Sequence, residues 1–205
     1  MGKILMALFL SHLPEEKEMY DIIWHGRGGQ GVVIAAQILA EAAYLQSFKG
    51  VTSAPTFGPE RRGAPVTAST RISKEPIRTF SQIEMADTAI VMDESLFKVV
   101  DIMGRVKKGG TIIINTAFPE QIGIKGCMKV ATVNAAGIAF NHRLVAGGAP
   151  VVNTPLLGAF SKVTGLISLD NIEKVLKRKL AREIADANFS AVYDAFNATK
   201  IMDKE

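Results

Sequence analysis

The order of apolar and polar positions from Tyr20 onward predicts an alternation of strands and helices. Short apolar runs predict strands, and a period-two alternation predicts one more: Tyr20–His25, Lys49–Ser53, Ala64–Ser73, Thr88–Met92, Thr111–Asn115 and Lys129–Asn134. Longer segments with helical periodicity predict helices at Gln30–Gln46, Glu94–Gly104, Ala136–Leu144, Pro155–Thr164, Leu169–Lys179 and Arg182–Asn197. Lys107–Gly110 is expected to form a tight turn before the strand at Thr111. This order is typical of an α/β fold, with an open, mostly parallel sheet flanked by helices and a helical arm at the C-terminus.

The length of the chain, 205 residues, suits one domain with an extension at each end. We expect an N-terminal extension over residues 1–19, a main domain over residues 20–180 and a helical tail over residues 181–205. The apolar run Ile4–Leu10 is too short to span a membrane, so the extension is expected to pack on the domain or on a neighbouring chain. No contact with a membrane is expected.

The formal net charge of +4 is mildly basic. Such a charge suits a polyanionic small ligand or an acidic partner, and it is equally typical of an ordinary solvated surface. The Lys and Arg residues are scattered along the chain instead of forming a stripe, so no binding of nucleic acid is expected.

Cys127 is the one cysteine of the chain, which excludes a disulfide or an all-cysteine metal or cluster site within it. A single free cysteine points to a reducing, cytoplasmic setting. Because no histidine stands near it in the sequence, we expect a buried, inert thiol in preference to a nucleophile.

A burst of glycines separates the first predicted strand from the first predicted helix. These residues fit the spacing G-x-G-x-x-G: Gly26, Arg27, Gly28, Gly29, Gln30 and Gly31. In a Rossmann-like fold such glycines permit a tight turn and a close approach to a diphosphate, and the N–H groups at the helix start attract phosphate. The loop therefore predicts a phosphate-bearing ligand. The alternative is that the glycines serve close packing of helix on sheet or of subunit on subunit.

A site for a dinucleotide such as NAD also requires a carboxylate about 20 residues further on, at the end of the second strand. Val51, Thr52 and Ser53 occupy that place, and Glu60 follows only after two prolines. This lack counts against a stand-alone NAD(P)-dependent oxidoreductase, which stays as an alternative hypothesis.

The segment TFGPERRGAP is a loop stiffened by two prolines, and Glu60, Arg61 and Arg62 project from it. Paired guanidinium groups can meet phosphate or carboxylate oxygens bidentately. These arginines can contact a ligand, or they can form an ion pair at a subunit interface with Glu60 as one partner. The sequence leaves both alternatives open.

Asn153-Thr154-Pro155 is typical of a helix start, with Asn153 or Thr154 as the cap and Pro155 at the first helical position. Asn153 can also hydrogen-bond a ligand at the carboxyl edge of the sheet, where open α/β sheets bind ligands. His25 ends the first predicted strand, and a packed, neutral imidazole is favoured over contact with the same ligand.

Four segments in this order resemble the gamma subunit or gamma domain of 2-oxoacid:ferredoxin oxidoreductases: HGRGGQGVVIAAQILAEAA, FGPERRGAPVTASTRIS, VNAAGIA and NTPLLGAFSKVTG. The resemblance extends from about Tyr20 to about Leu180. The glycine loop alone is unspecific, but its combination with FGPERRGAPV is highly specific. The Glu-Arg-Arg-Gly-Ala-Pro form is most similar to the pyruvate branch, pyruvate synthase.

The resemblance implies a multi-subunit enzyme that uses thiamine diphosphate, iron–sulfur clusters and coenzyme A. Such an enzyme interconverts a 2-oxoacid plus coenzyme A with an acyl-CoA and carbon dioxide, and passes electrons to ferredoxin. The family places thiamine diphosphate and clusters in alpha, beta and delta-type partners, and this chain has neither a Gly-Asp-Gly motif nor the cysteines for a cluster. The chain alone is expected to be inactive and to help bind coenzyme A and assemble the complex. A purely structural module is the other alternative.

The resemblance also implies where coenzyme A is bound. Arg61 and Arg62 stand where single-chain relatives carry a basic pair implicated in contact with coenzyme A. Asn153 matches an asparagine that borders the same site, and Asn134 begins a matching turn. Relatives often carry an arginine shortly before that asparagine, where this chain has Pro150-Val151-Val152. The expected site therefore consists of residues 26–31, Glu60, Arg61, Arg62, Asn134 and Asn153, with no catalytic residue and no metal ligand.

Overall fold

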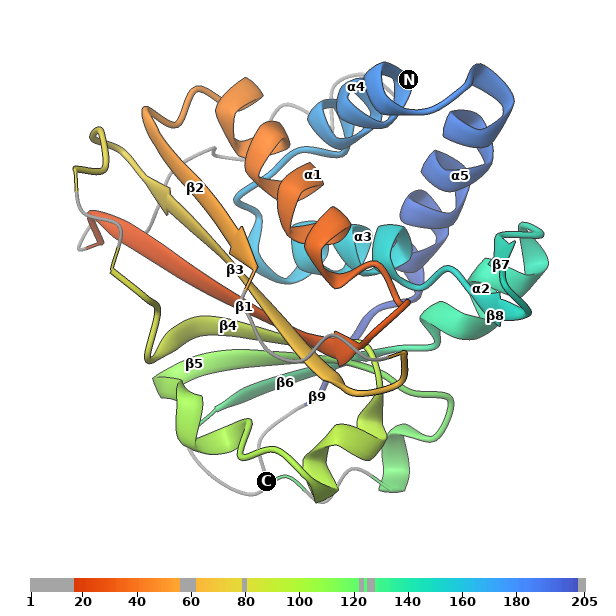
Figure 1. Ribbon diagram of the computed structural model, residues 1–205, viewed down its shortest axis with the longest axis horizontal. Helices are drawn as coiled ribbons and strands as arrows, with labels where there is room; N and C mark the ends of the chain where they lie inside the picture. Colours follow the sequence, from red (N-terminus) through yellow and green to blue (C-terminus); the bar gives the residue numbers. More distant parts are fainter. Residues whose placement is uncertain (1–16, 56–61, 79–80, 122–123, 125–127, 203–205) are drawn as a thin grey trace.

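The computed structural model describes residues 17–55, 62–78, 81–121, 124 and 128–202. Its centre is a seven-stranded sheet in the order β2-β3-β1-β4-β5-β6-β9 (Figure 1). The strands are β1 (Met19–Arg27), β2 (Gly50–Pro55), β3 (Pro65–Ser73), β4 (Ala86–Val91), β5 (Val106–Asn115), β6 (Lys129–Val133) and β9 (Lys200–Met202). β1, β4, β5 and β6 are parallel, whereas β3 pairs antiparallel with both β1 and β2, and β9 pairs antiparallel with β6. The predicted α/β class with an open, mostly parallel sheet is confirmed.

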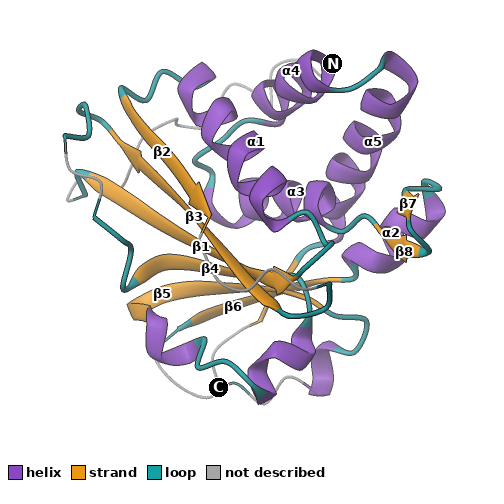
Figure 2. Cartoon of the chain, in the orientation of Figure 1, coloured by secondary structure: helices purple, strands orange, loops and turns teal. Residues whose placement is uncertain are grey.

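Helices cover one face of the sheet, and short helical turns lie on the other (Figure 2). The helices are α1 (Val32–Leu45), α2 (Ala135–Asn141), α3 (Asn153–Thr164), α4 (Leu169–Lys179) and α5 (Arg182–Ala198). The predicted C-terminal helical region is present, with α5 packed on α3 and α4 packed on α1. A small hairpin of β7 (Val145–Ala146) and β8 (Ala149–Pro150), which the sequence pattern did not predict, lies beside α2.

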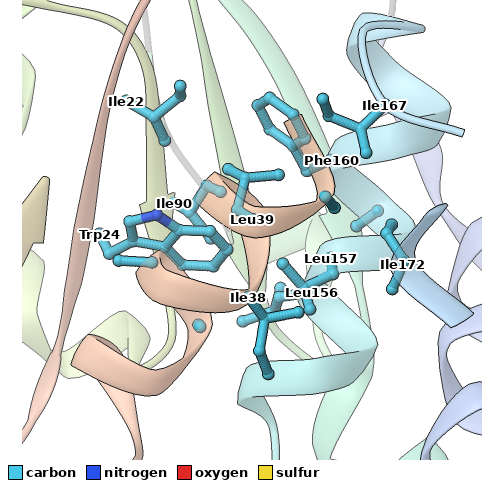
Figure 3. Close-up of a cluster of buried hydrophobic side chains, with 14 of the residues drawn as sticks. Ile22, Trp24, Ile38, Leu39, Ile90, Leu156, Leu157, Phe160, Ile167 and Ile172 are labelled. Atoms are coloured by element: carbon cyan, nitrogen blue, oxygen red, sulfur yellow. The ribbon is translucent and has the colours of Figure 1, made fainter. Parts of the chain in front are cut away.

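The main hydrophobic core lies between the sheet and the helices (Figure 3). Trp24 from β1 and Ile90 from β4 face Leu39 from α1, and Leu156 and Phe160 from α3 close the cluster. All five side chains are buried, and each contributes about 2 kcal/mol or more on the scale of apolar transfer. This core fixes the position of α1, and with it the glycine loop that precedes α1.

The predicted tight turn at Lys107–Gly110 is wrong, because these residues lie inside β5. β4 pairs with β5 at Ala86–Val106 and again at Thr88–Thr111, so β5 carries three extra residues between these two pairs. The surplus forms a bulge, with Gly109 at a φ of +76°. The glycine pair therefore marks an irregularity inside the strand and not its start.

The predicted helix at Glu94–Gly104 is also wrong, because this segment forms two short 3₁₀ turns, η1 (Glu94–Lys98) and η2 (Met103–Arg105). Its two buried side chains, Leu96 and Ile102, are six residues apart and do not share one face of an α-helix. The adjacent β-branched residues Val99 and Val100 further disfavour a helix.

Helix α3 begins two residues earlier than predicted, at Asn153, and Val152 occupies the cap position. Pro155 is therefore the third residue of the helix, where its missing N–H is still one that needs no partner inside the helix. No helix in the described ranges combines the length and apolarity needed to cross a membrane. The predicted environment of Cys127, the packing of Ile4–Leu10, and the positions of Glu60 and Arg61 lie outside the described residues.

A cluster of buried charges lies at the opposite edge of the sheet from the glycine loop. Asp87, 2% exposed, accepts hydrogen bonds from the ammonium groups of Lys17 (2.5 Å) and Lys107 (2.9 Å) and from the backbone N–H of Asp21 (2.8 Å). The Asp21 carboxylate accepts from Arg71 at 2.6 Å. Burial acts to raise the pKa of Asp87, but these hydrogen bonds outweigh it and hold the pKa below its usual range. The cluster ties β1 to β3, β4 and β5.

Candidate functional site

The glycine loop connects the carboxyl end of β1 to the start of α1, as predicted. A side chain at Gly26 would lie within 2.5 Å of Val32, and Gly31 has a φ of +75° and lies directly against the Asn153 side chain. Gly29, at a φ of +96°, faces open space. No described side chain caps α1, so the N–H groups of its first turn stay available to an anion. The Gln30 side chain accepts from the backbone N–H of Arg27 at 2.8 Å and closes the turn.

The Arg27 side chain donates to three protein acceptors. Its Nε contacts Asp93 Oδ2 at 2.9 Å, Nη2 contacts Ser95 Oγ at 2.7 Å, and Nη1 contacts the carbonyl oxygen of Gly63 at 2.9 Å. Ser95 in turn donates its backbone N–H and its hydroxyl to the other Asp93 oxygen. Burial acts to raise the pKa of Asp93, but the hydrogen bonds from Ser95 and the charge of Arg27 hold it below its usual range. Asp93 is therefore an ionised partner of Arg27.

The turn that carries Arg62 is joined directly to the glycine loop. Gly28 donates to the carbonyl oxygen of Ala64 at 2.9 Å, and Gly63 donates to that of Gly28 at 3.1 Å. Arg62 is exposed, and its Nη2 donates to the carbonyl oxygen of Gly147, at the tip of the β7–β8 hairpin, at 3.2 Å. The two predicted binding segments are thus brought side by side, although α1 and β2 separate them in the sequence.

A cleft of about 670 Å³ lies where the parallel strands end, between the glycine loop, α2 and the β7–β8 hairpin. Its volume lies in the range of small-molecule sites. It is lined by Gly28, Gly29, Gln30, Gly31, Ile34, Arg62, Met92, Asp93, Glu94, Asn115, Thr116, Ala117, Phe118, Asn134, Ala136, Ala146, Gly147, Ala149, Pro150, Val151, Val152 and Asn153. A second groove along the same loop is lined in part by Arg27 and Arg62.

The predicted residues Asn134 and Asn153 both line this cleft. Asn134 caps α2 by accepting from the N–H of Gly137 at 2.8 Å. Asn153 accepts from its neighbour Thr154 at 2.9 Å and donates weakly to the carbonyl oxygen of Gly31 at 3.4 Å. Both asparagines therefore have structural partners, and both are lining residues of the cleft.

Asn115, at the end of β5, is a lining residue that sequence reasoning missed. Its amide donates to the carbonyl oxygen of Met92 at 2.9 Å and accepts from the N–H of Ala136 at 3.2 Å. It therefore joins the ends of β4 and β5 to the start of α2 at the floor of the cleft. The available signal was an amide residue at the carboxyl end of a predicted parallel strand, the place where such sheets bind ligands.

The charged side chains that line the cleft differ in sign and in ion pairing. In the described part of the chain, Arg62 is the one cationic lining residue, and Glu94 and Asp93 are the anionic ones. Arg27 compensates Asp93, whereas Glu94 is exposed and forms no ion pair with a described residue. A phosphate group is therefore favoured beside Arg62 and the start of α1 and disfavoured beside Glu94.

His25 is packed and does not line the cleft. It is 1% exposed, on the opposite face of β1 from Trp24, and no described residue offers a hydrogen-bond partner to either ring nitrogen. Burial, aided by the nearby charge of Arg105, lowers its pKa to about 4, so the ring is neutral at pH 7. The packed, neutral imidazole predicted from the sequence is confirmed.

A family model described as "Pyruvate ferredoxin/flavodoxin oxidoreductase" matches residues 21–198, most of the chain. The chain belongs to this family. It is 42% identical over 189 residues to the pyruvate/ketoisovalerate oxidoreductases common subunit gamma of Pyrococcus abyssi, covering 90% of this chain and 100% of the relative. The resemblance to gamma subunits found in the sequence is confirmed, and the expectation of an enzyme subunit is confirmed with it, because the relatives are subunits of such oxidoreductases.

Solved structures of the family have the same architecture. The crystal structure of a pyruvate oxidoreductase subunit from Thermotoga maritima matches with a TM-score of 0.76 and 34% identity, covering 91% of this chain and 100% of that chain. A structure of 2-oxoglutarate:ferredoxin oxidoreductase from Magnetococcus marinus, with 2-oxoglutarate, coenzyme A and succinyl-CoA bound, matches with a TM-score of 0.74. This match covers 89% of this chain and 31% of that chain, and at 19% identity it shows the fold alone.

Proposed function

We propose that this chain is the gamma subunit of a CoA-acylating 2-oxoacid:ferredoxin oxidoreductase of the pyruvate type, acting in the cytoplasm. It contributes part of the coenzyme A site and helps to assemble the complex. Alpha, beta and delta-type subunits supply the thiamine diphosphate and iron–sulfur clusters, and ferredoxin accepts the electrons. The Pyrococcus relative is named as a subunit common to two oxidoreductases, so we assign the choice of 2-oxoacid to the partner subunits.

The observation that carries the proposal is the juxtaposition of an uncapped helix start, two positive-φ glycines and the exposed Arg62 at one edge of a cleft of about 670 Å³. Coenzyme A carries a diphosphate and a 3′-phosphate, which backbone N–H groups and a guanidinium can receive. Its pantetheine arm is largely apolar and fits the walls formed by Ile34, Phe118 and Val151. Only part of coenzyme A needs to lie here, and the thiol end extends toward the partner subunits.

The alternative of a stand-alone NAD(P)-dependent enzyme meets a topological obstacle. In a dinucleotide site, the acid that binds the ribose ends a strand next to the first one. Here β2, which carries Val51, Thr52 and Ser53, is an edge strand, and the antiparallel β3 separates it from β1. Neither the residue type nor the position suits a ribose hydroxyl, which favours coenzyme A as the ligand.

The test is the kinetics of the assembled oxidoreductase with Arg62→Ala in this chain. Loss of one charge-assisted contact is expected to raise the KM for coenzyme A roughly tenfold or more, with the KM for the 2-oxoacid within about twofold of wild type. Arg178→Ala, an exposed arginine on α4 outside both grooves, is the matched control and is expected to change neither constant. An equal rise of the KM for both substrates, or dissociation of the complex, would favour a purely structural module.

A further inference from the structure

We infer that Arg27 is a positioning residue that holds the Arg62 turn in its ligand-receiving conformation, and that it is not itself a ligand of the phosphate groups. This inference rests on the proposed function, because it concerns the same cleft. The place of Arg27 in the glycine loop predicts instead that it binds the ligand.

All three nitrogens of the Arg27 guanidinium are hydrogen-bonded within the protein. Nε, Nη1 and Nη2 each donate one N–H to a protein acceptor, at 2.9, 2.9 and 2.7 Å, and the acceptors come from two separate segments, Asp93–Ser95 and Gly63. An arginine held in this way has a fixed plane, so its two remaining N–H groups cannot be reoriented toward a phosphate without loss of the bonds to Asp93, Ser95 or Gly63. The ionised Asp93 beside it also cancels its charge.

Gly63 is held from both sides by the glycine loop. Its carbonyl oxygen accepts from Arg27 Nη1 and its N–H donates to the carbonyl oxygen of Gly28. Gly63 has a φ of +84°, so the turn adopts a backbone conformation that few other residues would keep without such support. Arg62 immediately precedes Gly63, so these two bonds fix the backbone from which the Arg62 side chain extends.

The contacts of Arg27 and Arg62 form a continuous chain from the end of β4 to the β7–β8 hairpin. Arg27 links Asp93 and Ser95, after β4, to Gly63, and Arg62 continues the chain of contacts to Gly147 on the hairpin. Loss of Arg27 leaves the backbone bonds of Gly28 but removes the side-chain tie to the strand end. The expected consequence is a mobile Arg62 with its side chain intact.

A double-mutant cycle in the assembled oxidoreductase tests the inference. Arg27→Lys and Arg27→Met are each expected to raise the KM for coenzyme A roughly fivefold to tenfold, because lysine keeps the charge but cannot reach three acceptors in one plane. Neither is expected to raise it further in an Arg62→Ala background, since both changes remove the same contact. Near-normal kinetics for Arg27→Lys, together with additive effects of Arg27→Met and Arg62→Ala, would mean direct ligand contact and overturn the inference.

Amide hydrogen exchange of the segment 62–66 in the complex without coenzyme A supplies a readout that does not depend on the ligand. Exchange is expected to be faster in Arg27→Met and Arg27→Lys, and unchanged in the Arg178→Met control. Ser95→Ala, which removes only one acceptor, is expected to give a smaller change in the same direction. If Arg62→Ala leaves the KM for coenzyme A unchanged, the proposed function fails, and amide exchange alone then tests the positioning role of Arg27. Amide exchange that is unaltered in both Arg27 variants would overturn that positioning role.

Discussion

Replacement of His25 by leucine is expected to protect the fold against mild acid without a large cost at neutral pH. The imidazole is buried, and no described residue hydrogen-bonds it, so removing its two nitrogens leaves no lost partner in that part of the chain. Leucine has a similar volume. We expect the free energy of unfolding of His25→Leu at pH 7 to lie within about 1 kcal/mol of wild type.

The pH dependence follows from the lowered pKa. The unfolded chain protonates His25 near its ordinary value of 6.5, whereas the folded chain does so only near 4. The unfolded state therefore binds more protons, and wild type loses stability as the pH falls from about 6.5 to about 4. Linkage gives a loss of about 2 kcal/mol from this group at pH 5. His25→Leu lacks this loss, so its advantage over wild type is expected to grow by about that amount between pH 7 and pH 5.

Urea unfolding of both proteins at pH 7, 6 and 5 measures the difference directly. Ile23→Val, a substitution of a buried apolar neighbour on the same face of β1, is the matched control, and its difference from wild type is expected to be independent of pH. A difference for His25→Leu that stays the same at pH 7 and pH 5 would refute a neutral, buried imidazole.

Three further predictions concern the charge cluster around Asp87, the glycine loop and the floor of the cleft. Asp87→Asn is expected to cost about 1 kcal/mol at pH 7, because the two lysines that bind Asp87 are part-exposed and can turn to solvent. Since the folded pKa of Asp87 lies below its ordinary 3.8, this cost is expected to be fully present above 3.8 and to disappear as the pH falls through the lower folded pKa, which urea unfolding at pH 7 and at a series of values below pH 3.8 would show. Gly31→Ala is expected to cost about 2 kcal/mol by thermal unfolding, from the positive φ and the contact with the buried Asn153, and an unchanged melting temperature would contradict this. Asn115→Ala leaves the N–H of Ala136 without its acceptor and is expected to destabilise the fold by about 1–3 kcal/mol and to raise the KM for coenzyme A, whereas wild-type kinetics would exclude a role at the cleft floor.

Several local features of the fold could be predicted from the sequence because each depends on neighbouring residues. The apolar runs at Tyr20–His25 and Lys129–Asn134 became β1 and β6, and the periodic segment at Leu169–Lys179 became α4 with its bounds unchanged. The glycine loop was predicted at its true place, since only glycine tolerates the positive φ of Gly29 and Gly31 at little cost. Where local signals conflicted, prediction failed, as at Glu94–Gly104, whose helical composition carries no shared buried face.

The arrangement of the site was decided only by the tertiary structure. Sequence could nominate Gly28, Arg62 and Asn153, and the sheet order brings their segments to one cleft. It could not show that each guanidinium nitrogen of Arg27 already donates to the protein, because Asp93 and Ser95 lie more than sixty residues away and reach it through the parallel pairing of β1 with β4. Residue types fix what a side chain can donate or accept, and periodicity fixes which element carries it. Which donor meets which acceptor depends on long-range strand pairing, and local sequence does not encode the partner.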